Sequence, residues 1–135
     1  MTALKRHFIV IDDNKLDCFI AEKIILNTGM SDRIRVYTDA REALQLIKAG
    51  EDQHLHNKIV ILVDIQMPLM NGFEFVEAFE ILPDDIKSNY TIFMLTSSIN
   101  QSDLNRISNY NSVKDLLNKP LSQVKLSTMI QTLDN

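Results

Sequence analysis

The sequence predicts an α/β fold in which helices cover both faces of a parallel sheet. Short apolar runs of strand length alternate along the chain with amphipathic segments of helix length, which is the pattern of repeated βαβ units. Two of these runs, Ile59–Val63 and Thr91–Leu95, are almost continuously apolar, as expected for central strands buried on both faces. The 135 residues divide into five strand–helix pairs, so we predict a single domain, residues 1–135, with a doubly wound five-stranded parallel sheet and five helices.

The first pair begins with the strand Phe8–Ile11. Asn14 can cap the helix that follows, Asp17 falls in its first turn, and Gly29 ends it. Large apolar side chains share one face of this helix, which we expect to be its packing face: Leu16, Phe19, Ile20 and Ile24. Cys18 stands among apolar residues and is interpreted as a small core or boundary residue.

The second pair consists of the strand Ile34–Tyr37 and a helix that starts after Asp39, has Glu42 in a variant of the capping box, and ends at Gly50. The polar stretch Glu51–Lys58 that follows is predicted to be a loop. It contains a His-x-His pair, His54 and His56, without a Cys or acidic partner at ligand spacing. We therefore interpret these histidines as solvated rather than as zinc ligands.

The third strand, Ile59–Val63, precedes a helix over about Gly72–Leu82 that Pro83 ends. The predicted buried face of this helix consists of Phe75, Val76 and Phe79. Phe73 lies off this stripe and could be exposed.

The fourth and fifth pairs complete the fold. The strand Thr91–Leu95 leads into a polar helix, Asn100–Asn109, whose Asn and Ser residues are poor interior helix formers, so we expect this helix to be mobile. The strand Val113–Leu117 and the helix Leu121–Leu133 follow.

Composition narrows the classes of function. The formal net charge is −4 and the basic residues are scattered, which argues against direct binding of nucleic acid. One cysteine excludes an internal disulfide and favours a reducing compartment. The first residues are too few and too polar for a signal peptide or a membrane span, so we expect a cytoplasmic protein without membrane insertion. No linker marks a second or output domain.

Polar residues follow four of the predicted strands at the point where each strand ends. They are Asp12 and Asp13 after the first strand, Asp64 after the third, Thr96 after the fourth and Lys119 after the fifth. The carboxyl ends of parallel strands border one crevice, so these side chains should meet there. Grouped carboxylates call for a hard cation such as Mg²⁺, while a hydroxyl and an ammonium suit a transferred phosphoryl group. A carboxylate nucleophile would then form an acyl phosphate.

Four segments carry a resemblance to a known family. They are Ile11-Asp12-Asp13-Asn14, Val63-Asp64-Ile65-Gln66-Met67-Pro68 with Asn71-Gly72, Leu95-Thr96-Ser97-Ser98 and Leu117-Asn118-Lys119-Pro120. In this order and spacing the chain resembles a bacterial response-regulator receiver domain of the chemotaxis-regulator type over essentially its full length. The resemblance implies a flavodoxin-like sheet with strand order 2-1-3-4-5 and a two-component signalling function.

The resemblance also implies a role for each matching residue. Asp64 would accept phosphate from a histidine kinase or phosphotransfer protein, in a reaction that requires Mg²⁺ or, as an alternative, Mn²⁺. The implied metal ligands are Asp13, Asp64, the backbone carbonyl of Gln66 and, through water, Asp12. Thr96 and Lys119 would bind the phosphoryl oxygens, and the Lys119-Pro120 peptide would be cis. Gly72 would relieve crowding in the loop after Asp64, and Gln66 and Ser98 would tune the rates.

The output implied by the family is protein binding rather than turnover of a substrate. The surface that the family usually uses for dimers and targets would comprise the helix 100–109, the last strand and the last helix, including Arg106, Lys114, Asp115 and Lys125. The resemblance also implies that phosphorylation could drive formation of a homodimer. At the position where the family usually has Tyr or Phe as a switch residue, this chain has Leu116, so switching should depend more on Thr96 and the mobile helix.

Three alternatives stay open at this point. Leu116 suggests a degenerate receiver that binds a partner without phosphorylation, and an intermediate in a phosphorelay would carry the same motifs as a terminal switch. A phosphatase of the haloacid-dehalogenase kind would also use an aspartyl phosphate, but its Asp-x-Asp signature is missing because position 66 is Gln.

Overall fold

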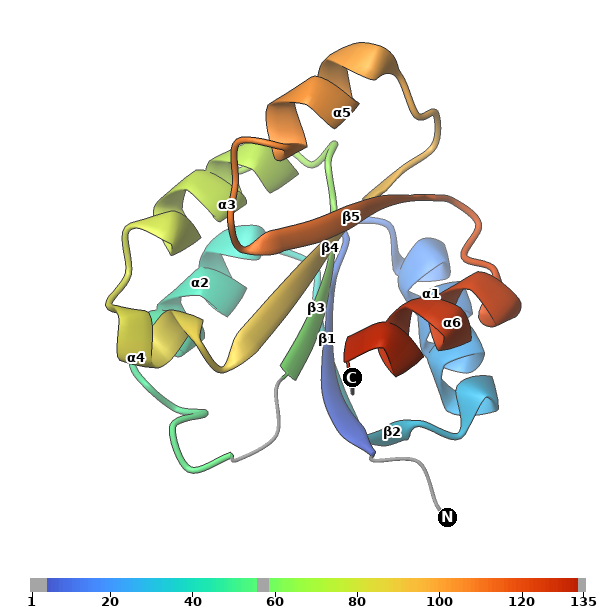
Figure 1. The fold of residues 1–135 in the computed structure, drawn as a ribbon, viewed down its shortest axis with the longest axis horizontal. Coiled ribbons are helices and arrows are strands. Elements are labelled where there is room, and N and C mark those ends of the chain that lie inside the picture. The colour runs from blue at the N-terminus through green and yellow to red at the C-terminus, as the bar shows by residue number, and fades with distance from the viewer. Residues whose placement is uncertain (1–4, 56–58, 134–135) are drawn as a thin grey trace.

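The computed structural model of the chain describes residues 5–55 and 59–133. In these ranges five strands form one parallel sheet in the order β2-β1-β3-β4-β5 (Figure 1). The strands are β1 (Arg6–Ile11), β2 (Ser31–Tyr37), β3 (Ile59–Asp64), β4 (Tyr90–Thr96) and β5 (Val113–Asn118). The helices are α1 (Lys15–Thr28), α2 (Ala40–Lys48), α3 (Gly72–Glu80), α4 (Asp84–Lys87), α5 (Gln101–Ile107) and α6 (Gln123–Leu133). The parallel, doubly wound architecture confirms the predicted fold.

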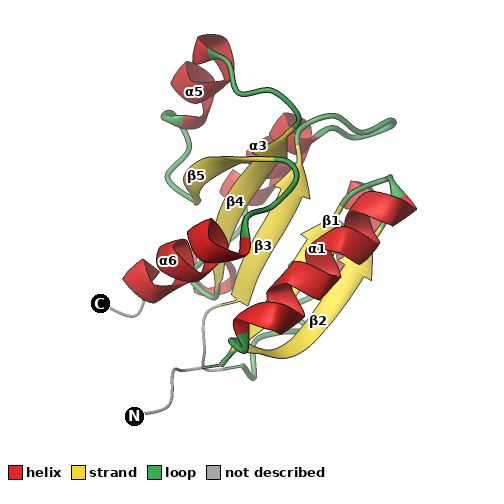
Figure 2. Ribbon diagram, turned by 90° about the vertical axis from the view of Figure 1, so that its right-hand side faces the viewer, coloured by secondary structure: helices red, strands yellow, loops and turns green. Residues whose placement is uncertain are grey.

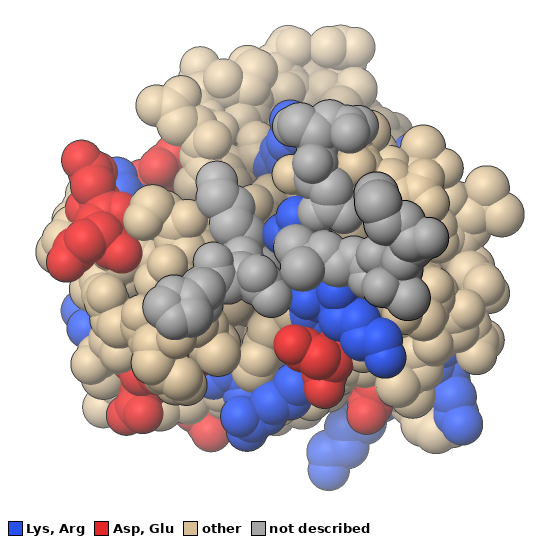
Figure 3. Space-filling view, turned by 60° about the horizontal axis from the view of Figure 1, so that its bottom comes forward, with Lys and Arg blue, Asp and Glu red and all other residues tan. Residues whose placement is uncertain are grey.

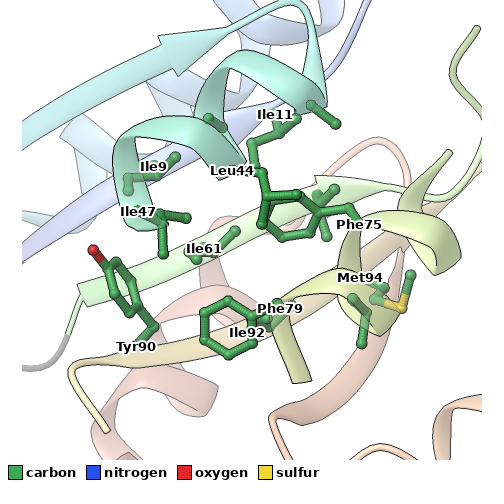
Figure 4. Close-up of a cluster of buried hydrophobic side chains, with 14 of the residues drawn as sticks. Ile9, Ile11, Leu44, Ile47, Ile61, Phe75, Phe79, Tyr90, Ile92 and Met94 are labelled. Carbon is green, nitrogen blue, oxygen red and sulfur yellow. The ribbon is translucent and has the colours of Figure 1, made fainter. Parts of the chain in front are cut away.

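Two hydrophobic cores lie on opposite faces of the sheet. Helices α1 and α6 pack side by side over one face (Figure 2), while α2 and α3 cover the other, with α4 and α5 on the same side (Figure 1). Alternate residues of a strand point to opposite faces, so in β1 Phe8 joins the core under α1 and α6 while Ile9 joins the core under α2 and α3. Figure 4 shows this second core, where Phe75 and Phe79 of α3 lie against side chains of β1, β3 and β4.

The helix count differs from the prediction, because the described residues contain six helices rather than five. Pro83 follows the third helix, as expected, but it then stands at the N-cap of the short helix α4. Asp84 and Asp85 occupy the first turn of α4, where negative charge is favourable next to free backbone N–H groups. Strand β2 also begins at Ser31, earlier than predicted, because backbone pairing with β1 extends over polar residues at the edge of the sheet.

The predicted packing face of α1 is correct only in part: Ile24 packs against the core, as expected, but other residues of the predicted face do not. The buried residues of α1 are Cys18, Ala21 and Ile25, whereas Leu16 and Phe19 are 65% and 55% exposed. The prediction followed the large apolar side chains, but two small residues, Cys18 and Ala21, lie under the helix together with Ile25. We attribute this choice of face to Cys18 and Ala21, which allow a close approach to the sheet. The interpretation of Cys18 as a small core residue is confirmed.

A buried ion pair anchors the segment between α2 and β3, which was predicted to be a plain polar loop. Asp52 is 5% exposed and accepts two hydrogen bonds from the Arg35 guanidinium, at 2.8 and 2.9 Å. Tyr90 donates its hydroxyl hydrogen to the same carboxylate, and Arg35 Nε donates to His7 Nε2 at 2.9 Å. Three strands and this segment are thereby joined by one polar network.

The surface near the start of the strands carries both signs of charge. On the face drawn in Figure 3, basic side chains lie beside acidic ones. His54 is exposed, as expected of a solvated residue, while His56 lies outside the described residues. No helix among the described residues has the length and apolar character needed to span a bilayer.

Candidate functional site

Three carboxylates meet at the carboxyl edge of the sheet. Asp64 is the last residue of β3, and Asp12 and Asp13 directly follow β1, which is the neighbour of β3. Carboxylate oxygens from Asp12, Asp13 and Asp64 all lie within 4.8 Å of one another. Asp12 and Asp64 are buried and Asp13 is exposed, so the cluster opens to solvent on one side.

This donor set fits a magnesium ion. Opposite ligands of an octahedral Mg²⁺ are about 4.2 Å apart, so a small closure of the three carboxylates would bring them to coordination distance. The open side next to Asp13 leaves room for the waters that Mg²⁺ retains. When bound, the ion would neutralise carboxylates that otherwise repel one another.

Lys119 reaches into the acidic cluster from the segment between β5 and α6. Its Nζ atom lies 2.6 Å from Asp12 Oδ2, 3.2 Å from Asp64 Oδ2 and 2.9 Å from Asp17 Oδ2. The peptide bond between Lys119 and Pro120 is cis. Sequence reasoning missed the contact with Asp17, which it treated only as a first-turn residue. The only signal available was its place in the first turn of a helix that starts just after Asp12 and Asp13.

Burial and neighbouring charges shift the proton affinities in the cluster. Burial raises the pKa of the Asp64 carboxyl, and the charge of Asp12 adds to this effect, while Lys119 and the Gln66 backbone N–H oppose it. Burial alone would lower the pKa of Lys119, but hydrogen bonds to Asp12 and Asp17 outweigh it and raise the pKa above its usual value. Lys119 therefore stays protonated as a fixed positive charge beside Asp64.

Asp12 is held in place from three directions. Its Oδ1 accepts the Asn14 backbone N–H at 3.0 Å, and its Oδ2 accepts a hydrogen bond from Lys119. Below it, the Cys18 thiol donates to the Asp12 carbonyl at 3.1 Å. Burial raises the pKa of this thiol to about 11, so Cys18 remains an uncharged donor.

Thr96 and Gln66 lie in the same cleft as the acidic cluster. Thr96 is the last residue of β4, is buried, and exchanges hydrogen bonds of 3.2 Å with the backbone of Ser98. The cleft is lined by Asp13, Asn14, Asp17, Asp64, Gln66, Thr96, Ser97, Ser98, Asn100, Asp103 and Lys119. Asp12 does not line this cleft but joins Asp13, Asp64 and Lys119 in the acidic cluster.

The loop after Asp64 passes close to the end of β3. A Cβ atom added to Gly72 would lie 2.5 Å from the Asp64 carbonyl oxygen, so this position requires glycine. The Gly72 N–H donates to the Ile65 carbonyl at 2.8 Å and closes the loop. Within it, Leu69 has a φ of 70°, a left-handed conformation that is unfavourable for leucine, and its side chain is exposed.

Helix α5 rests on α3 through a small network. The Arg106 guanidinium lies 4.0 Å from the centre of the Phe73 ring and 3.2 Å from Glu77 Oε2. Tyr110 also donates its hydroxyl hydrogen to Glu77. Phe73 is therefore buried under Arg106, although it lies off the main apolar stripe of α3. Leu116 is buried in the same core.

Comparisons with known proteins agree with this geometry. The family described as "response regulator receiver domain" matches residues 8–131. Stress response regulator protein 1 of Lodderomyces elongisporus is 25% identical over 99% of this chain and 34% of that protein. The sensor histidine kinase CheAY of Helicobacter pylori is 29% identical over 91% of this chain and 14% of the kinase.

A solved structure extends the similarity to three dimensions. The response regulator receiver protein of Dyadobacter fermentans is 30% identical and superposes with a TM-score of 0.84, covering 94% of this chain and 96% of that chain. The chain spans 34% and 14% of the two curated relatives, so the similarity to them concerns one part of each. Its fold, its strand-end carboxylates and the match over residues 8–131 place this chain in the response regulator receiver domain family.

Proposed function

We propose that this protein is a phosphorylation-driven switch in which Asp64 accepts a phosphoryl group from a histidine kinase or phosphotransfer protein. The observation that carries the proposal is the position of Asp64, which lies within 4.8 Å of two further carboxylates and 3.2 Å from a protonated lysine. Such an arrangement supports binding of a cation and an anion side by side, as phosphoryl transfer requires.

The proposed reaction uses the chain's own groups as follows. A carboxylate oxygen of Asp64 forms a bond to phosphorus, the bond from phosphorus to the donor's imidazole nitrogen breaks, and the imidazole keeps the electron pair. Lys119 and the Thr96 hydroxyl would donate hydrogen bonds to the phosphoryl oxygens. Mg²⁺, held by Asp12, Asp13, Asp64 and the Gln66 carbonyl, would stabilise the negative charge on the transferred group.

Protein binding is the proposed output. Arg106 of α5, Lys114 and Asp115 of β5 and Lys125 of α6 belong to the surface that we propose for targets or for a second copy. Arg106 is already engaged by Phe73 and Glu77, so a shift of α5 would change this surface directly. Because Leu116 has neither a large ring nor a hydroxyl, we expect the signal to travel through Thr96 and α5.

Intact-mass analysis after incubation with acetyl phosphate and Mg²⁺ tests the proposal. We expect one phosphoryl adduct on the wild type and none on Asp64→Asn or in the presence of a chelator. A folded wild type that gains no adduct from acetyl phosphate or a partner kinase, and binds no beryllofluoride, would instead be a phosphorylation-independent binding module, the reading suggested by Leu116. Transfer of the phosphoryl group from Asp64 to a histidine protein would identify a phosphorelay intermediate.

A further inference from the structure

Asp17 is a fourth carboxylate at the phosphoacceptor cleft, and it comes from a helix rather than from a strand end. Its Oδ2 lies 2.9 Å from Lys119 Nζ, the nitrogen that also contacts Asp12 and Asp64. An ammonium group has three N–H bonds, so each can be directed at a carboxylate before any phosphoryl group arrives. Of the three partners, Asp17 has the most exposed side chain, at 37%, and therefore lies nearest the mouth of the cleft.

Asp17 increases the negative charge of the cleft, which Asp103 also lines. The carboxylates Asp12, Asp13 and Asp64, together with Lys119 and one divalent cation, carry no net charge. Asp17 adds one negative charge at the mouth, where a donor must enter. Small acyl phosphates are anions, and like charges repel strongly in a partly buried site.

Asp17 also competes for Lys119, the group that must donate a hydrogen bond to the phosphoryl oxygens. When the phosphoryl group is transferred to Asp64, Lys119 has to turn a hydrogen toward it. A third ion pair on the side of α1 opposes this movement. Removing it would leave Lys119 held by the buried Asp12 carboxylate at 2.6 Å, so the lysine would stay in the cleft.

We propose that Asp17 is a positioning residue that holds Lys119 on the α1 side of the cleft and acts as an electrostatic brake on phosphoryl uptake by Asp64. This inference rests on the proposed function. With acetyl phosphate, the bond between Asp64 and phosphorus forms as the bond from phosphorus to the acetyl oxygen breaks, and acetate leaves with the electron pair. The negative charge of Asp17 raises the barrier to the approach of the donor.

The test compares the rate of adduct formation in Asp17→Asn and wild type with acetyl phosphate and Mg²⁺, followed by intact mass at several salt concentrations. We expect uptake to be about 3- to 10-fold faster in Asp17→Asn at low salt, with the difference shrinking as salt screens the charge. Asp17→Glu, which keeps the charge, should return toward the wild-type rate. Glu22→Gln removes one charge from the same helix more than a turn away and serves as the matched control.

A second measurement does not depend on the reaction. The chain has no tryptophan, so binding of beryllofluoride with Mg²⁺ is best followed by NMR, and we expect tighter binding to Asp17→Asn than to wild type. A role of Asp17 limited to stabilising the start of α1 would change neither the salt dependence nor this affinity.

The outcomes separate the brake from the proposed function. If wild type is labelled and Asp17→Asn takes up the phosphoryl group no faster, the brake is overturned while the proposed function stands. An equal increase in the uptake rate of Glu22→Gln would overturn the brake in the same way. Labelling of Asp17→Asn alone would show a brake strong enough to block small donors. Absence of labelling and of beryllofluoride binding in both proteins would reject both proposals.

Discussion

Replacing Asp64 by asparagine should stabilise the fold when no divalent cation is available. Asp64 is buried, and its carboxylate lies within 4.8 Å of those of Asp12 and Asp13. At an effective dielectric constant near 20, each of these two repulsions costs about 3.5 kcal/mol, while the attraction to Lys119 at 3.2 Å returns about 5 kcal/mol. The balance of about 2 kcal/mol disfavours the charged residue, and burial of the charge adds to it. The asparagine amide keeps the size of the original side chain without its charge.

Urea unfolding followed by far-UV circular dichroism in a chelating buffer measures this effect. An increase of about 2 kcal/mol corresponds to a rise of roughly 1 M in the urea midpoint for a protein of this size. Mg²⁺ should then stabilise the wild type much more than Asp64→Asn, because only the wild type presents the complete ligand set. Asp85→Asn, on the exposed first turn of α4, is the matched control and should change the midpoint little.

An Asp64→Asn variant that unfolds in chelator at the same or a lower urea concentration than the wild type would contradict this prediction. Such a result would mean that the attraction to Lys119 exceeds the repulsion and desolvation that Asp64 experiences. Equal stabilisation of both proteins by Mg²⁺ would separately argue against Asp64 as a ligand.

Three further predictions concern the rest of the fold. Asp52→Ala leaves the Arg35 guanidinium without its buried carboxylate and should lower the unfolding free energy by about 3–5 kcal/mol in urea titrations, whereas Arg41→Ala, in an exposed pair, should change it little. Burial and Arg35 lower the pKa of His7 below 6.5, so the unfolded chain binds the proton more readily; stability should fall as pH drops below about 6.5, less steeply in His7→Gln. Leu69→Asn should raise the unfolding free energy by about 1 kcal/mol in urea titrations, because asparagine tolerates the left-handed φ; no gain would show that the leucine is not strained there.

The sequence alone was sufficient for the architecture and for most of the cleft. Continuous apolar runs such as Ile59–Val63 can be buried on both faces only in a covered parallel sheet, and in such a sheet the strand ends share one edge. Asp12, Asp64 and Lys119 therefore had to approach one another, whatever the details of packing. The resemblance implied a glycine at position 72, and the structure gives the reason, because a side chain there would collide with the backbone of the preceding strand.

Contacts between elements far apart in the chain were decided only by the tertiary structure. The buried face of α1 depends on which side chains fit against the sheet, so the small Cys18 and Ala21 were buried and the larger Phe19 was left exposed. Phe73 became buried because Arg106, on another helix, covers its ring.

Asp17 and Asp52 show the same limit for charged residues. Each looked like an ordinary polar residue in a helix start or a loop, and each gained its role from a partner distant in the sequence: Lys119 for Asp17, and Arg35 for Asp52. Periodicity and local propensity describe how a segment divides its own faces between core and solvent. They carry no information about which opposite charge the fold brings within hydrogen-bonding distance, and in this protein those contacts determine which carboxylates Lys119 pairs with in the cleft beside Asp64.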